Sequence, residues 1–178
     1  MKANSFLKIT FLFVILFFSN FVNAQKVSHY IINEEYFEFP GKWEHKGQLK
    51  SSSQYHFVNK KTDVSLMIVV AKPEKYEFYE TGLSESELLE KYYKWETDYW
   101  KTGEKVLVSE LKRNSNYIIW RIFKEKVKGN IDLNSYLLFS VRNNKLTGIT
   151  LNDNGEKPMS EEEKIKFLED IFQSQNKK

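Results

Sequence analysis

Residues able to perform metal or acid–base chemistry are few in this chain. Its three histidines are His29, His45 and His56. A metal site needs two or three such side chains to converge, ideally with a carboxylate. No two of them have the helical i, i+4 spacing, no H-x-H pair exists, and Glu44 and His45 are expected in a loop. The sequence therefore predicts no metal site.

Motifs for covalent catalysis and for phosphate binding are also missing. The sequence has no G-x-S-x-G elbow and no glycine-rich nucleotide loop. It has no cysteine, which excludes disulfides, thiolate catalysis and cysteine-bound metals. The carboxylates Glu34 and Glu35 precede a strand, and the run at residues 161–163 is explained by helix capping. We therefore predict no catalytic residue, no cofactor and no enzymatic activity.

Aromatic residues are the most informative candidates for binding. Eight lie between residues 76 and 100: Tyr76, Phe78, Tyr79, Tyr92, Tyr93, Trp95, Tyr99 and Trp100. Helical spacing assigns Tyr92, Trp95 and Tyr99 to the core. The other five are predicted to form a binding surface, three of them from a long loop at residues 72–84 and two, Tyr93 and Trp100, from a flanking helical stripe. The alternative is that these rings are buried beneath the loop.

The first 24 residues have the pattern of an export signal. Lys2 and Lys8 precede a run at residues 9–18 that is apolar except for Thr10, and Val22-Asn23-Ala24 resembles a cleavage site. The alternative is a membrane anchor, but ten helical residues cover only about half of a 30 Å hydrocarbon core. We expect cleavage after Ala24, export to the periplasm or medium, and no integral membrane span in the mature chain.

Without the predicted leader, the mature chain is nearly neutral and has the length of one domain. Removing the two basic residues of the leader leaves 25 basic against 24 acidic side chains, a net charge of +1. No basic run interleaves with aromatics, so a nucleic-acid partner is not expected. Residues 25–178 contain no repeat or linker, and their length suits a single domain.

Periodicity predicts the elements of this domain. A strand at residues 36–39 stops at Pro40-Gly41, and a hairpin follows at residues 54–58 and 64–71. The first helix begins at the capping box Ser84–Glu87 and carries a stripe from Leu88 to Tyr99. Four strands then form an antiparallel meander, with Asn143-Asn144 as a two-residue turn. Ser160 opens a last amphipathic helix.

This order predicts an α+β fold, a mostly antiparallel sheet of about six to seven strands with two packed helices. Four residues are predicted as core positions: Trp43, Leu88, Trp95 and Leu168.

The order of elements, together with F-E-F-P-G-K-W at residues 37–43, resembles the PsbP-like fold. The resemblance covers residues 36–174 and extends to the Ran-binding protein Mog and the DcrB-like bacterial envelope proteins. It implies binding and assembly rather than catalysis, and it carries no catalytic residue over to this chain. The motif itself is interpreted as a strand stop followed by a buried tryptophan.

Three functions remain open at this stage. The first is an exported accessory protein that binds a protein partner. The second is a carrier of a small ligand or glycan in an aromatic-lined pocket between sheet and helix. The third is a hydrolase with carboxylates or histidines brought together from distant strands.

Overall fold

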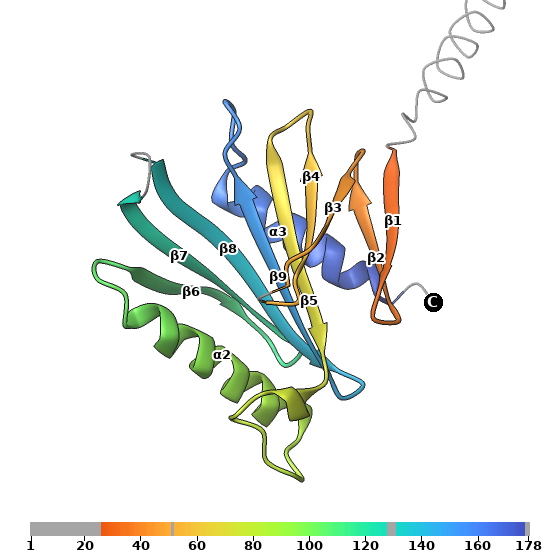
Figure 1. Cartoon of the computed structure of the whole chain (residues 1–178), viewed down its shortest axis with the longest axis vertical. Helices are drawn as coiled ribbons and strands as arrows, with labels where there is room; N and C mark the ends of the chain where they lie inside the picture. The colour runs from red at the N-terminus through yellow and green to blue at the C-terminus, as the bar shows by residue number, and fades with distance from the viewer. Residues whose placement is uncertain (1–25, 51, 128–130, 177–178) are drawn as a thin grey trace, which may run out of the picture.

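The computed structural model describes residues 26–50, 52–127 and 131–176, so the predicted leader lies outside the described residues. Two antiparallel sheets and two α-helices make up this part of the chain (Figure 1). The elements, in chain order, are β1 (Val27–Ile32), β2 (Glu35–Pro40), β3 (Glu44–Gln48), β4 (Tyr55–Asn59), β5 (Val64–Ala71), the 3-10 turn η1 (Pro73–Lys75), α2 (Glu85–Lys101), β6 (Leu107–Arg113), β7 (Tyr117–Val127), β8 (Ile131–Arg142), β9 (Lys145–Asp153) and α3 (Glu161–Ser174).

The larger sheet has seven strands in the order β3-β4-β5-β9-β8-β7-β6. Its strands β6 to β9 form the predicted meander, and the predicted hairpin β4–β5 joins it through β5 and β9, from Val64 opposite Asp153 to Ala71 opposite Leu146. Strands β1 and β2 pair separately. The α+β class and the mostly antiparallel sheet are therefore confirmed.

The helices begin where the sequence predicted. The Ser84 and Ser160 hydroxyls each accept a hydrogen bond from the backbone N–H of the third helical residue, and the Glu87 and Glu163 carboxylates accept one from the backbone N–H of the capping serine. Each capping box satisfies amide groups that would otherwise lack a partner at the helix start. At the meander turn, Asn143 and Asn144 have φ of 50° and 54°, which confirms the expected two-residue turn.

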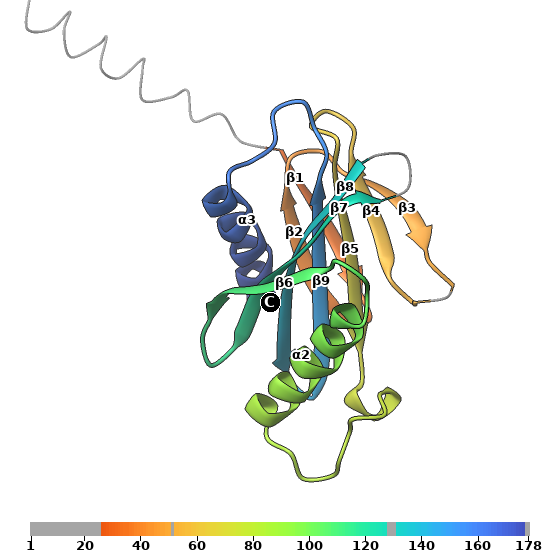
Figure 2. The ribbon, with the colours of Figure 1, turned by 90° about the vertical axis from the view of Figure 1, so that its left-hand side faces the viewer.

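Side chains alternate between two cores on the two faces of the large sheet, with α2 and α3 on opposite faces (Figures 1 and 2). On β5, Leu66, Ile68 and Val70 face α3 and the β1–β2 hairpin. Leu137 and Phe139 of β8 face α2.

Three of the four predicted core residues are buried: Trp43, Leu88 and Leu168. The motif at residues 37–43 has the structural role expected of it, because Phe39 and Trp43 pack edge to face and the Trp43 indole donates a hydrogen bond of 2.9 Å to the Pro40 carbonyl.

Two predictions about the elements are wrong. Glu44 and His45 belong to the edge strand β3, not to a loop. This strand escaped notice because its sequence, EHKGQ, has no apolar alternation, as is common where an edge strand faces water. Trp95 is only partly buried, and its place on α2 is described below.

No helix among residues 26–50, 52–127 and 131–176 is long and apolar enough to cross a membrane.

Candidate functional site: the groove between α2 and the sheet

Helix α2 covers only part of its face of the sheet. Leu88, Leu89 and Tyr92, in its first half, pack against the side of the sheet formed by β7 and β8. Farther along the same stripe the covering is incomplete: Trp95 is half-buried, and Tyr99 is 68% exposed, so its predicted core position is wrong. The part of this face that α2 leaves uncovered includes residues of β4, β5, β9 and β8.

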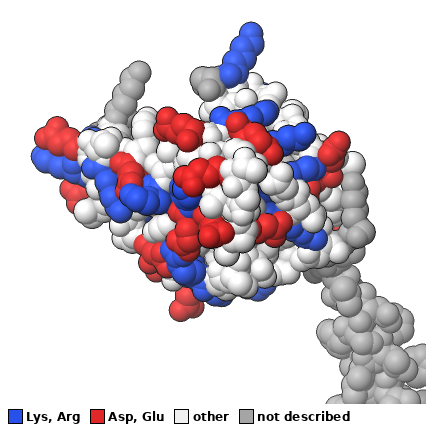
Figure 3. All heavy atoms as spheres, turned by 90° about the horizontal axis from the view of Figure 1, so that it is seen from below, with Lys and Arg blue, Asp and Glu red and all other residues white. Residues whose placement is uncertain are grey.

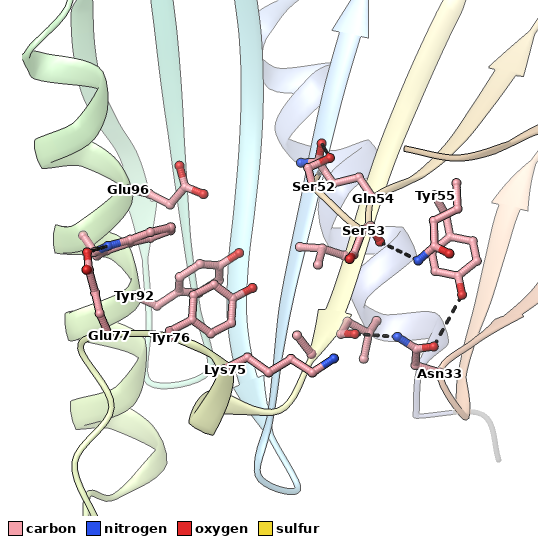
Figure 4. Close-up of a pocket in the computed structure, with 15 residues that line it drawn as sticks. Asn33, Ser52, Ser53, Gln54, Tyr55, Lys75, Tyr76, Glu77, Tyr92 and Glu96 are labelled. Atoms are coloured by element: carbon pink, nitrogen blue, oxygen red, sulfur yellow. Dashed lines mark hydrogen bonds between the residues drawn. The ribbon is translucent and has the colours of Figure 1, made fainter. Parts of the chain in front are cut away.

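A groove lies between α2 and this uncovered part of the sheet (Figure 4). Its wider part, the outer groove, has a volume of about 820 Å³ and lies between α2 with the loop before it and the start of β4. A second part, the inner chamber, has a volume of about 380 Å³ and lies between α2 and strands β5, β9 and β8. Gln54, Val69, Tyr92 and Glu96 line both parts, so the two spaces adjoin.

Packed rings build the wall on the helix side. The Tyr76 ring lies 5.5 Å from both Tyr92 and Trp95 and stacks on Phe78 at 5.3 Å. Tyr92 in turn stacks on Phe139 of β8 with centroids 4.2 Å apart and planes 11° apart. The hydroxyls of Tyr76 and Tyr92 point from this wall into the groove (Figure 4).

Glu96 places a carboxylate in the same space (Figure 4). Burial removes water from this group and raises its pKa, and a hydrogen bond from Trp100 opposes part of that rise. Across the described ranges, no lysine, arginine or histidine forms an ion pair with Glu96. Burial also raises the pKa of Tyr76, and it raises that of Tyr92 well above its ordinary value, with the Tyr76 and Glu96 charges adding to the effect for Tyr92.

The opposite wall is polar. It consists of amide and hydroxyl side chains from the β1–β2 turn, β3 and the start of β4: Asn33, Gln48, Ser52, Ser53, Gln54 and Tyr55. The Asn33 amide donates a hydrogen bond of 2.7 Å to the Val70 carbonyl, and the Gln48 amide donates one of 3.0 Å to the Ser53 carbonyl. These bonds hold the wall in place, and Lys75 extends along the loop end of the groove (Figure 4).

The five residues predicted to bind do not form one surface. Tyr76 lines the outer groove and Trp100 the inner chamber. Phe78 and Tyr79 are half-buried among the rings beneath the loop. Tyr93 lies apart from the groove residues, edge-on to Trp120 and beneath the guanidinium of Arg113 at 5.4 Å.

Sequence reasoning missed Glu96, although a signal was present. Glu96 follows Tyr92 by four residues and precedes Trp100 by four, so it is an acidic residue within an aromatic stripe. The predicted loop at residues 72–84 is also less irregular than expected, because η1 forms its first turn.

The histidines and paired carboxylates have local structural contacts. His29 lies 2.6 Å from the Tyr36 hydroxyl, and His45 packs against the ring of Phe57. Glu34 and Glu35 both accept from the Lys145 ammonium, at 3.0 and 3.1 Å. Within the described residues, no group of three or more His, Cys, Asp or Glu side chains is placed to hold a metal ion.

Charges of both signs are interspersed over the face seen from below (Figure 3).

No protein-family model matches the sequence, and no curated protein is significantly similar to it. The PsbP-like resemblance therefore stays a prediction that depends on the F-P-G-K-W motif and on the order of elements.

Proposed function

We propose that this chain is an exported, non-enzymatic binding protein that holds a small organic ligand in the groove between α2 and the sheet. The observation that carries the proposal is the groove itself. Its outer part, at about 820 Å³, is within the size range of small-molecule sites. Aromatic rings on one wall face amide and hydroxyl groups on the other, a combination that gives both apolar contact and directional hydrogen bonds.

This proposal favours the ligand carrier over the protein-binding accessory function. The loop rings expected to contact a protein partner, Phe78 and Tyr79, are half-buried against α2. Rings packed against α2 stabilise the wall of the groove and offer little protruding surface to a protein partner. Binding of a protein partner stays a prediction, and the five residues predicted for it do not form one surface in the described part of the chain.

A ligand screen with two tryptophan variants tests the proposal. Gln54 lines both parts of the groove, so Gln54→Trp should fill it, whereas Gln173 is exposed on α3 and Gln173→Trp should leave the groove open. A library of soluble metabolites is screened against the mature protein for an increase in melting temperature. We expect compounds that stabilise the wild type and Gln173→Trp but not Gln54→Trp. An absence of stabilising compounds, or equal stabilisation of all three proteins, would reject the proposal.

Export is tested separately by intact-mass measurement of the protein secreted from its native cell. The expected mass corresponds to a chain that begins at Gln25. A mass that includes residues 1–24 would show that the leader is retained.

A further inference from the structure

The inner chamber has an unbalanced charge. Among its fifteen lining residues, Glu96 is the only carboxylate, and none is a lysine, arginine or histidine. The other lining residues are aromatic, aliphatic or neutral and polar, among them Tyr99, Trp100, Leu137 and Thr150. Lys75 lines the outer groove but not the chamber. The chamber therefore presents one negative charge and no positive one.

Aromatic rings lie on both sides of this carboxylate along α2. Tyr92, Glu96 and Tyr99 recur at i, i+4 and i+7, which places them on one face of the helix, and Trp100 lines the same chamber. The faces of tyrosine and tryptophan rings attract cations through their quadrupole. Tyr92 contributes its hydroxyl, because its ring stacks on Phe139 and packs against Phe78. The Glu96 carboxylate and the rings of Tyr99 and Trp100, which line the same small space, thus favour the same kind of ligand group.

The partial burial of the Glu96 carboxylate lowers the stability of the fold. A partly buried carboxylate loses hydration, and no cation in the described part of the chain compensates for it. Tyr76 and Tyr92 are its neutral neighbours, and a hydrogen bond from Trp100 stabilises its charge. Groups that lower stability in this way are concentrated at functional sites, where a ligand supplies the missing partner.

We infer that the inner chamber binds the ammonium group of a small organic cation, with Glu96 as its counter-ion and the rings of Tyr99 and Trp100 beside it. This inference depends on the proposed function, because it names the class of ligand that the groove selects. A small anion would meet an unpaired carboxylate, and a neutral ligand would leave that carboxylate uncompensated.

A pair of probes with the same shape tests the charge. Choline carries a quaternary ammonium, and 3,3-dimethylbutan-1-ol is its uncharged carbon counterpart. Binding of each to the mature protein is followed by the shifts of the tryptophan indole N–H signals in NMR spectra, since Trp100 lines the chamber. We expect choline to bind about tenfold more tightly than the alcohol, which corresponds to about 1.4 kcal/mol.

Two variants test whether the preference for the charged probe comes from Glu96. Glu96→Gln keeps the shape and hydrogen-bonding capacity of the side chain and removes its charge. Glu162→Gln is the matched control, because it makes the same change of charge at an exposed position on α3. We expect Glu96→Gln to bind choline about tenfold less tightly and to leave the alcohol unaffected, and we expect Glu162→Gln to behave as the wild type.

Three results would overturn the inference. They are the absence of a shift with choline up to about 50 mM, equal affinities for the two probes, and equal loss of choline binding in both variants. These results are distinguishable from failure of the proposed function. If the library screen finds a neutral ligand whose binding is blocked by Gln54→Trp, the groove binds ligands and only the charge preference is wrong.

Discussion

Replacing Gly148 by alanine should narrow the inner chamber from its floor. Gly148 lies in β9, opposite Val69 of β5 and Phe139 of β8. A Cβ atom there would lie 2.8 Å from the Tyr92 hydroxyl oxygen, 3.0 Å from Cγ1 of Val69 and 3.3 Å from Cε1 of Phe139. Favourable contacts between such atoms are about 3.5–4.0 Å, so the Tyr92 ring must move. It cannot move toward the sheet, because Phe139 already stacks on it at 4.2 Å.

The size of the effect follows from two opposing contributions. Overpacking a well-filled core costs about 1–3 kcal/mol. Replacing a glycine within a strand by alanine recovers about 0.5–1 kcal/mol by restricting the unfolded chain. We therefore expect Gly148→Ala to lower the free energy of unfolding by about 1–2 kcal/mol, which urea denaturation should show as a decrease in midpoint of roughly 0.5–1 M. Displacement of Tyr92 into the chamber should also weaken ligand binding.

A double-mutant cycle tests the mechanism. In a Tyr92→Phe background the closest atom, the hydroxyl oxygen, is absent, so the same alanine should cost about 1 kcal/mol less than in the wild type. If the two substitutions are additive, the hydroxyl is not the atom that the new methyl group meets. If Gly148→Ala instead stabilises the protein, the close packing around Gly148 is itself refuted.

Three further predictions concern charge, capping and packing. Because the pKa of Glu96 is raised in the folded state, its ionisation disfavours folding, so stability is lost as pH rises from the ordinary value of 4.5 through the folded pKa. Glu96→Gln should therefore be more stable than the wild type at pH 7, with a difference that disappears in denaturation curves near pH 4; a difference independent of pH would contradict this origin. Ser160→Ala should cost about 1 kcal/mol by removing the cap of α3, whereas Ser109→Ala, at an exposed strand position, should cost less than about 0.5 kcal/mol; equal costs in urea denaturation would argue against the capping contribution. Leu168→Ala should cost about 2–5 kcal/mol because the side chain is fully buried, and Trp95→Ala should cost less than the roughly 3–5 kcal/mol of a buried tryptophan; a larger loss of thermal stability for Trp95→Ala would show that its ring is a core residue after all.

The local elements could be predicted from the sequence because their determinants are neighbours in the chain. The capping serines Ser84 and Ser160 bond to residues only three positions away, and Asn143 and Asn144 adopt the positive φ that these side chains tolerate. Alternation of apolar residues likewise indicated the strands of the meander. Its strands β7, β8 and β9 carry buried side chains on both faces, one set in each core. Edge strand β3 was missed because both of its faces are largely polar and give no such alternation.

The groove depended on tertiary structure. Helical spacing placed Leu88, Tyr92, Trp95 and Tyr99 on one face of α2, and they do share that face. Spacing could not show where the sheet beneath this face is covered, because coverage depends on how α2 lies across strands that are distant in the chain. As a result Leu88 is 2% exposed and Tyr99 is 68% exposed, although both satisfy the same periodicity. The same placement puts Glu96, an ordinary acidic residue in the sequence, in the lining of the inner chamber beside Tyr99 and Trp100.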